Sequence, residues 1–494
     1  MTNISDNTAI TKLEVGIPGF DDIARGGIPE GRTTLVTGST GTAKTVFGCQ
    51  FLGSGIEDYG QNGVFVTFEE NPNDIRINML SFGWQIADWE ASGNWAFVDV
   101  SQQAEETIVA GPFDLDALLA RIRHAIETVG ATRVVLDSIS AVFARFNNNA
   151  IIRVELYRIA SALKQIGVTT IMSAERDQEY GPVARYNIEE FVADNVIILR
   201  NILHGERRRR TLEILKFRGA IHHKGEYPFT IIPDEGIEVI PLASLQLRQD
   251  SNNLRVTSGS QELDDMCNGG FFRDSVVMVS GATGAGKTLL ATTFMAGGAA
   301  VGERSLMFAF EESPQQIFRN AAGWGIDIES LASGELVQIH SEYPETAGLE
   351  DHLIRMKSVI EEYQPKRIVV DSISALRRIS SATGFREFII ALTSFIKHEE
   401  IAGLFTTTAT NLTGSDIITE AHISTITDSI ILLRYIEFQG TIMRGITILK
   451  MRGSLHDQRI REFTIDSEGI HVGRPLDNIG GILAGNPRLN NDDL

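Results

Sequence analysis

A glycine-rich segment in the second half of the chain has the residues that hold the phosphates of a nucleotide. Its sequence GATGAGKT spans residues 281–288, after the apolar run SVVMVS and before the apolar run LLATTFMAG. A strand, a glycine-rich loop and a helix in this order are the context of a P-loop, whose backbone amides surround the phosphates while its lysine adds a positive charge. The predicted ATP ligands are Thr283, Gly284, Ala285, Gly286, Lys287 and Thr288.

A second segment, GSTGTAKT at residues 38–45, has the same spacing but carries Ala43 where the motif has glycine. A methyl group at this position fits the loop if the φ angle of Ala43 stays negative. On that condition we expect ATP to bind in the first half as well. The predicted ligands are Ser39, Thr40, Gly41, Thr42, Ala43, Lys44 and Thr45.

Each half also has an apolar strand that ends in aspartate, RVVLDS with Asp137 and RIVVDS with Asp371. A carboxylate at this place can hold Mg²⁺ through its water shell, beside the P-loop hydroxyl. One such aspartate alone is often a turn residue, but two copies behind two P-loops favour the magnesium role. The predicted magnesium ligands are Thr45, Asp137, Thr288, Glu311 and Asp371.

Paired glutamates end the apolar strand that follows each P-loop helix. The pairs are Glu69 with Glu70 and Glu311 with Glu312. At the active edge of a sheet a carboxylate can take a proton from water or from a hydroxyl, so both pairs are predicted catalytic residues. An acidic pair at a helix N-terminus is the alternative interpretation.

One pair of cations occurs late in each half, Lys216 with Arg218 in KFRG and Lys450 with Arg452 in KMRG. They are either surface charges or nucleotide ligands. In ring-forming ATPases such residues reach the γ-phosphate bound by the neighbouring protomer and neutralise charge in the transition state. In that role the two pairs require an oligomer.

The motifs recur at a nearly constant spacing. Lys44 and Lys287 lie 243 positions apart, and Asp137 and Asp371 lie 234 apart, so the drift amounts to a few short insertions or deletions. Within each half, short apolar runs such as GVFVTFEE alternate with segments of helical period. The pattern predicts two tandem α/β domains, 1–247 and 248–494, each with a mostly parallel twisted sheet and helices on both faces.

The composition is that of a soluble globular protein, with 43% hydrophobic and 22% charged residues among 494. No apolar stretch is long enough to span a membrane, and the first residues lack the pattern of a signal peptide, so a cytoplasmic protein is expected. The two cysteines, Cys49 and Cys267, predict no disulfide framework. The net charge of −20 makes DNA an unfavourable partner, and the basic run at residues 207–210 is interpreted as a solvated hairpin.

Taken together, several segments resemble the KaiC family of circadian clock ATPases and autokinases. They are the two P-loop halves, the FEE that follows each loop, KFRG and KMRG, and the segments EEFVADNVIILRN, GERRRRTLEILK, ETAGLEDHL and ITEAHISTITDSIILL. The resemblance spans roughly residues 10–490. It implies RecA-like and DnaB-like domains in a double-ring homohexamer that binds ATP between protomers.

The resemblance also implies separate activities for the two halves. The first half, CI, is expected to hydrolyse ATP with Glu69 and Glu70, and the second half, CII, is expected to phosphorylate and dephosphorylate itself with Glu311 and Glu312. The remaining CII residues implied are Trp324 and Met451 as ATP ligands and Ser424 and Thr425 as phosphoacceptors.

An internal comparison restricts this modification to the second half. Asp194 and Asp428 are again 234 positions apart, which places Glu190 and Phe191 opposite the two acceptor residues. The first half therefore has no acceptor hydroxyl at this place.

The implied partners are KaiB, docking on the first half around GPFDLDALL, and an output histidine kinase. The chain stops at NPRLNNDDL, sooner than the tail by which typical KaiC proteins bind KaiA, so KaiA stays an open partner. Two alternative functions also remain open. A DNA recombinase or helicase of the same fold needs basic channel loops, against which the net charge counts, and a nucleotide-gated scaffold would bind ATP without turnover.

Overall fold

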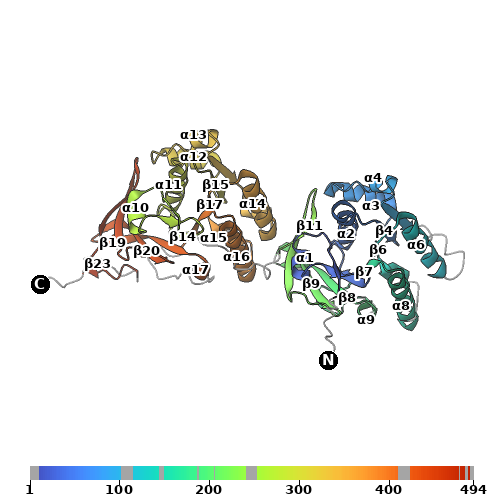
Figure 1. Ribbon diagram of the computed structural model, residues 1–494. Helices are drawn as coiled ribbons and strands as arrows, with labels where there is room; N and C mark the ends of the chain where they lie inside the picture. The colour runs from blue at the N-terminus through green and yellow to red at the C-terminus, as the bar shows by residue number, and fades with distance from the viewer. Residues whose placement is uncertain are drawn as a thin grey trace, which may run out of the picture. The chain divides into compact units, whose positions relative to one another are not determined.

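The computed structural model describes residues 10–101, 115–143, 149–185, 189–204, 206–240, 253–409, 423–477, 479–483 and 488–489. These residues belong to two compact units, Met1–Ser244 and Leu245–Leu494 (Figure 1). The predicted boundary at residue 247 lies outside the described residues. No helix in the described part of the chain is both long enough and apolar enough to span a membrane.

The elements of the first unit are β1 (Lys12–Leu13), α1 (Phe20–Ala24), β2 (Ile28–Pro29), β3 (Thr33–Gly38), α2 (Lys44–Tyr59), β4 (Gly63–Thr67), α3 (Pro72–Met79), η1 (Leu80–Phe82), α4 (Ile86–Ala91), β5 (Trp95–Asp99), α6 (Leu115–Val129), β6 (Arg133–Asp137), α7 (Ile139–Phe143), α8 (Asn149–Ile166), β7 (Thr169–Glu175), α9 (Glu189–Val192), β8 (Asn195–His204), β9 (Arg207–Phe217), β10 (Glu226–Ile232) and β11 (Gly236–Val239).

The elements of the second unit are β12 (Arg255–Val256), α10 (Gln261–Met266), β13 (Phe271–Phe272), β14 (Val276–Gly281), α11 (Lys287–Ala299), β15 (Ser305–Ala309), α12 (Pro314–Ala322), α13 (Ile328–Ser333), β16 (Val337–Ser341), η3 (Pro344–Thr346), α14 (Leu349–Tyr363), β17 (Arg367–Asp371), α15 (Ile373–Arg378), α16 (Ala382–His398), β18 (Ala402–Thr408), α17 (Ile423–Ile426), β19 (Ser429–Phe438), β20 (Thr441–Met451), β21 (Arg461–Asp466), β22 (Gly469–Pro475), β23 (Ile479–Gly480) and β24 (Arg488–Leu489).

The main sheets of the two units have the same topology. The first has the order β11-β10-β9-β8-β3-β7-β6-β4-β5, and the second has the order β22-β21-β20-β19-β14-β18-β17-β15-β16. From β8 to β5 and from β19 to β16 all neighbours are parallel, and the remaining strands extend each sheet in antiparallel fashion. The predicted α/β fold, with a mostly parallel sheet in each half, is confirmed.

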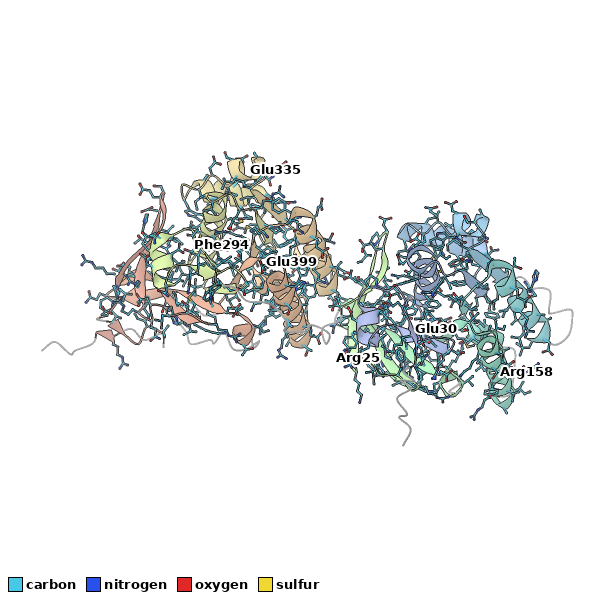
Figure 2. All side chains as sticks on the ribbon, in the orientation of Figure 1. Arg25, Glu30, Arg158, Phe294, Glu335 and Glu399 are labelled. Carbon is cyan, nitrogen blue, oxygen red and sulfur yellow. The ribbon has the colours of Figure 1, made fainter. Side chains whose placement is uncertain are left out.

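Helices cover both faces of the parallel part of the first sheet, so the strands β3 and β4 are buried along their whole length. Side chains alternate between the faces, so Phe65 of β4 packs on the side of α2, while Val64 and Val66 pack on the side of α6 and α8 (Figure 1). In the second unit Phe294 of α11 lies in the interior, whereas Glu335 lies at the surface (Figure 2). The cysteines are free and buried, as expected for a chain without a disulfide framework.

Each sheet contains one fully buried arginine at the start of the strand that ends in the predicted magnesium aspartate. Arg133 donates hydrogen bonds to the carbonyls of Phe51 (2.7 Å) and Glu14 (2.8 Å). Its counterpart Arg367 donates a hydrogen bond of 2.9 Å to the carbonyl of Phe294. These bonds connect the strand to the P-loop helix and satisfy buried carbonyls, which stabilises the position of that helix.

Candidate ATP-binding sites

The first P-loop connects β3 to α2 and closes around its own lysine. Lys44 Nζ donates hydrogen bonds to the carbonyls of Gly38 (2.9 Å) and Ser39 (3.0 Å), and burial lowers the pKa of this lysine against the opposing effect of Asp137. The loop opens into a cleft of about 280 Å³. The cleft is lined by Thr40, Gly41, Ala43, Lys44, Thr45, Val46, Glu69, Glu70, Asp137, Ser138 and Glu175.

The condition attached to Ala43 is wrong. Its φ and ψ angles are 70° and 32°, in the left-handed region, and it caps the N-terminus of α2. The corresponding Gly286 has a φ angle of 108°, so both loops have a positive φ angle here and only the second uses the residue suited to it. An alanine in this region costs roughly 1–2 kcal/mol, which the rest of the first P-loop must offset.

The two predicted magnesium ligands of the first unit are in direct contact. Thr45 Oγ1 donates a 2.6 Å hydrogen bond to Asp137 Oδ2, and the other carboxylate oxygen accepts one from Ser173. A hydroxyl and a carboxylate side by side at the mouth of a phosphate loop fit the oxygen ligands that Mg²⁺ prefers. Mg²⁺ at a phosphate loop is commonly held by one or two protein oxygens together with substrate phosphates and water, which Thr45 and Asp137 fit.

The second P-loop, between β14 and α11, repeats this geometry. Lys287 Nζ donates 2.9 Å hydrogen bonds to the carbonyls of Gly281 and Ala282, and burial lowers its pKa. Thr288 Oγ1 donates a 2.8 Å hydrogen bond to Asp371 Oδ2. The structure therefore brings the predicted loop residues and the predicted magnesium aspartate together in both units.

Glu69 and Glu70 follow β4 and line the first cleft beside Asp137. Burial raises the pKa of Glu69, and the carboxylates of Glu175 and Asp137 raise it further, while Lys44 opposes the shift. Burial also raises the pKa of Glu70, against a 2.7 Å hydrogen bond from Asn78 Nδ2 that favours its ionised form. Carboxylates with raised pKa values in a cleft are suited to accept a proton.

The corresponding pair in the second unit has a different charge environment. Burial raises the pKa of Glu312, which accepts a 3.4 Å hydrogen bond from Asn320, the counterpart of Asn78. Glu311, however, forms a 2.9 Å ion pair with Arg378 at the end of α15. Among the described residues, the two sites are therefore similar in their phosphate loops and different in the charges around the predicted proton acceptor.

The late cations lie near the amino ends of the parallel strands, whereas the P-loop of the same unit lies at their carboxyl ends. In the first unit Phe217, between the two cations, pairs with Asn195 of β8, and Asn195 pairs with Thr34 near the start of β3. The P-loop begins at Gly38, about four residues further along β3, which is roughly 13 Å at the rise of a strand. Arg218 forms an ion pair with Asp194 (3.4 Å), which directly precedes β8.

The second unit has the same arrangement. Met451, between the two cations, pairs with Ser429, which pairs with Val277 near the start of β14. Lys450 Nζ donates a 2.6 Å hydrogen bond to the carbonyl of Thr427, and Arg452 Nη2 donates one of 2.6 Å to the carbonyl of Thr425. The cations are thus adjacent to the predicted phosphoacceptor segment and distant from their own P-loop.

The two predicted phosphoacceptors lie on α17, one short helix before β19. Thr425 is exposed, whereas the side chain of Ser424 lies outside the described part of the structure. Glu190, their counterpart position in the first unit, lies on α9. The acceptor roles stay a prediction.

Two predicted ATP ligands, Met451 and Trp324, lie in or against the hydrophobic core of the second unit. Met451 is a core residue, 6% exposed, so only its backbone is available to a nucleotide. Trp324 follows α12 and packs, partly buried, against the core of the second unit. Residues 111–114 of the predicted KaiB-docking segment 111–119 lie outside the described residues.

Several residues of the first site were missed by sequence reasoning. Glu175 ends β7 and lines the cleft, and Glu179 accepts a hydrogen bond from Ser39 Oγ. Asn201 and Arg210 both donate to the carbonyl of Gly41, at 3.3 Å and 3.4 Å. The only available signal was that Arg210 belongs to the basic run 207–210, which does form a hairpin with β8 as predicted.

The family model described as "ATPase: KaiC" matches residues 13–244 and again residues 256–477. The circadian clock protein KaiC3 of Synechocystis sp. is 58% identical over 483 residues, covering 98% of this chain and 95% of that protein. The circadian clock oscillator protein KaiC of Synechococcus elongatus is 51% identical over 485 residues (98% and 93%), and that of Thermosynechococcus vestitus is 52% identical over 478 residues (97% and 92%).

Proposed function

The chain belongs to the KaiC family of ATPases, and on that premise we propose that it is a circadian clock protein that hydrolyses ATP in its first unit and phosphorylates itself in its second. The proposed assembly is a homohexamer with ATP between protomers. In it, each P-loop faces the late cations of the neighbouring protomer.

The observation that carries this proposal is the position of the late cations near the amino ends of the parallel strands, opposite to their own P-loop. A monomer cannot use Lys216, Arg218, Lys450 or Arg452 on its own nucleotide, but a head-to-tail neighbour can present them.

Exposed apolar side chains beside the cations support such an interface. Leu215 and its counterpart Leu449 are 45% and 50% exposed, and Ile221 and its counterpart Leu455 are 67% and 83% exposed. Large apolar residues exposed at the same place in two homologous units are typical of a repeated protein contact.

The residues of the second unit support phosphoryl transfer to a hydroxyl. The hydroxyl oxygen of Thr425 or Ser424 of one protomer forms a bond to the γ-phosphorus, the bond from that phosphorus to ADP breaks, and the hydroxyl proton passes to Glu311 of the neighbour. Lys287 stabilises the charge that develops on the phosphate oxygens. Mg²⁺, which Thr288, Asp371 and Glu311 would hold, supplies further charge neutralisation when bound.

The residues of the first unit support hydrolysis. Water takes the place of the hydroxyl, and Glu69, with Glu70 beside it, accepts the proton as the bond to ADP breaks. The raised pKa values of both carboxylates make them better proton acceptors than an ordinary surface glutamate. Thr45 and Asp137 would hold Mg²⁺ here.

The proposed partners follow from the family. They are KaiB on the first unit and an output histidine kinase, with KaiA as an open partner. The relatives named above are clock proteins, which supports a clock role for this chain.

Mixed hexamers test the proposal. One subunit type carries Glu311→Gln and keeps both hydroxyls, and the other carries Ser424→Ala and Thr425→Ala and keeps Glu311. Mass spectrometry after incubation with Mg-ATP is expected to find phosphate on the Glu311→Gln subunits, well above the level in hexamers of that type alone. Equal levels in mixed and unmixed hexamers would refute transfer between protomers.

A further inference from the structure

A loop at residues 176–185, here called the strap, lies against the first P-loop. It begins directly after β7, where Glu175 pairs with Gly38, the residue that opens the P-loop. Thr37 Oγ1 donates a 2.7 Å hydrogen bond to the carbonyl of Val183, and the backbone amide of Arg176 donates one of 3.2 Å to the carbonyl of Gly38. The strap is therefore fixed to the strand that carries the P-loop.

The strap is closed by its own buried arginine. Arg176, 5% exposed, donates hydrogen bonds through its side chain to the carbonyls of Pro182 (3.1 Å) and Gly181 (3.1 Å). A loop with internal hydrogen bonds of this kind holds its side chains in defined positions.

Glu179 of the strap contacts the P-loop. One carboxylate oxygen accepts a hydrogen bond from Ser39 Oγ, and the other accepts one of 3.0 Å from the backbone amide of Asn201. Arg200 holds the backbone of the same residue by donating a 3.2 Å hydrogen bond to the carbonyl of Glu179. A carboxylate that joins a loop hydroxyl to a strand amide is a strong connection, because a charged acceptor strengthens both hydrogen bonds.

The second P-loop cannot form this connection. Ala282 stands at the place of Ser39 and has no hydroxyl to donate. That loop instead has Gly286 at the position with a positive φ angle, where the first loop has Ala43. Among the described residues, the loop with the unfavourable backbone residue is thus the loop that has this hydrogen bond.

We propose that Glu179 is a positioning residue of the first unit, which holds the P-loop in its ATP-binding conformation against the strain at Ala43. The inference rests on the proposed function, since it assumes that the first P-loop binds ATP. Without the Glu179 contact, the loop can relax from the left-handed angle at Ala43 and lose the arrangement of amides that the phosphates require.

The test measures binding of an ATP analogue with a methylanthraniloyl fluorophore to the full chain. Every variant carries Lys287→Ala, so that only the first P-loop binds with high affinity. Glu179→Gln is expected to raise the Kd about 5- to 20-fold, the loss that corresponds to one charge-assisted hydrogen bond. In steady-state hydrolysis the KM is expected to rise by a similar factor, with kcat at saturating ATP within about twofold of the parent.

Two further variants separate positioning from a general loss of structure. Ser39→Ala removes the same hydrogen bond from the other side, so the double variant with Glu179→Gln is expected to bind no more weakly than Glu179→Gln alone. Adding Ala43→Gly to the Glu179→Gln chain is expected to lower the Kd at least about threefold, because glycine removes the strain. The matched control is Asp177→Asn, which removes an exposed carboxylate from the same strap and is expected to leave the Kd unchanged.

Each outcome has a defined meaning. If the parent chain does not bind the analogue at its first P-loop, the proposed function of that unit is wrong. If the parent binds and Glu179→Gln leaves the Kd unchanged or lowers it, the inference about Glu179 is wrong. If Glu179→Gln does not fold, Ser39→Ala with and without Ala43→Gly decides, and additive effects of these two changes would overturn the proposal.

Discussion

Arg452 and Thr425 are joined by a 2.6 Å hydrogen bond from the guanidinium to the backbone carbonyl. The cation that we propose to act on the neighbour's nucleotide therefore also holds the segment that carries the predicted phosphoacceptor Thr425. In the first unit the corresponding Arg218 lies beside Asp194, where there is no acceptor hydroxyl to present.

This hydrogen bond predicts that replacing Arg452 and replacing Arg218 affect different activities. Arg452→Ala is expected to slow phosphorylation of Thr425 at least about tenfold, because it removes a transition-state charge and releases the acceptor segment. Arg218→Ala is expected to slow ATP hydrolysis by the first unit and to leave phosphorylation largely intact. Phosphopeptide mass spectrometry and phosphate release, measured on both variants, check this, and equal effects on both activities would contradict it.

Replacing Ala43 by glycine is predicted to stabilise the first unit. Glycine adopts a φ angle of 70° without the steric cost that alanine has, so the free energy of unfolding is expected to rise by about 1 kcal/mol. Urea unfolding followed by tryptophan fluorescence measures the change. The control is Ala285→Gly in the second P-loop, where the buried alanine has no positive φ angle and the same change is expected to destabilise.

Asp21 predicts a pH dependence of stability. Burial raises its pKa from 3.8 to about 6, although its carboxylate accepts hydrogen bonds from the amides of Val15 (2.9 Å) and Gly16 (3.0 Å). The folded protein therefore binds this proton more tightly than the unfolded chain. The stabilisation is complete below about pH 4 and is lost as the pH rises through 6, by roughly 3 kcal/mol at most.

The measurement for Asp21 is urea unfolding at pH 4, 5, 6 and 7 for the parent and for Asp21→Asn. The difference between the two free energies of unfolding isolates this group from the other titrating residues. A difference that stays constant over this range would show that Asp21 does not titrate as described.

The buried Arg367 is predicted to be essential for the stability of the second unit. Its side chain, 1% exposed, donates hydrogen bonds to Glu303 (2.8 Å) and to the carbonyls of Thr257 (2.7 Å) and Phe294 (2.9 Å). Arg367→Met leaves these acceptors without their donor and is expected to cost about 3–5 kcal/mol in unfolding experiments. Arg158→Met, at an exposed ion pair on α8, is the control and is expected to cost less than about 1 kcal/mol.

The parts of the site that the sequence predicted are those that lie together along the chain. A P-loop is contiguous, and an aspartate or glutamate at the end of an apolar strand is carried to the active edge by the parallel order of the sheet. The contacts from Thr45 to Asp137 and from Thr288 to Asp371 follow from these two rules alone.

The parts that the sequence did not predict come from segments far apart in the chain. Glu179 and Ser39 are separated by 140 positions, and their contact depends on how an irregular loop folds after β7. No periodicity or motif encodes such a contact. The backbone of Ala43 was missed for a related reason, because the loop imposes a φ angle that alanine by itself avoids.

The opposite placement of the P-loop and the late cations on one sheet determines how many working sites an assembly contains. Counted for one of the two units, a row of n protomers joined head to tail has n − 1 complete sites, whereas a closed ring has n. In the proposed ring, a copy that lacks both the P-loop and the late cations of one unit would damage two sites of that unit, its own and that of its neighbour. In the proposed ring, turnover per protomer would therefore fall when dilution opens the rings.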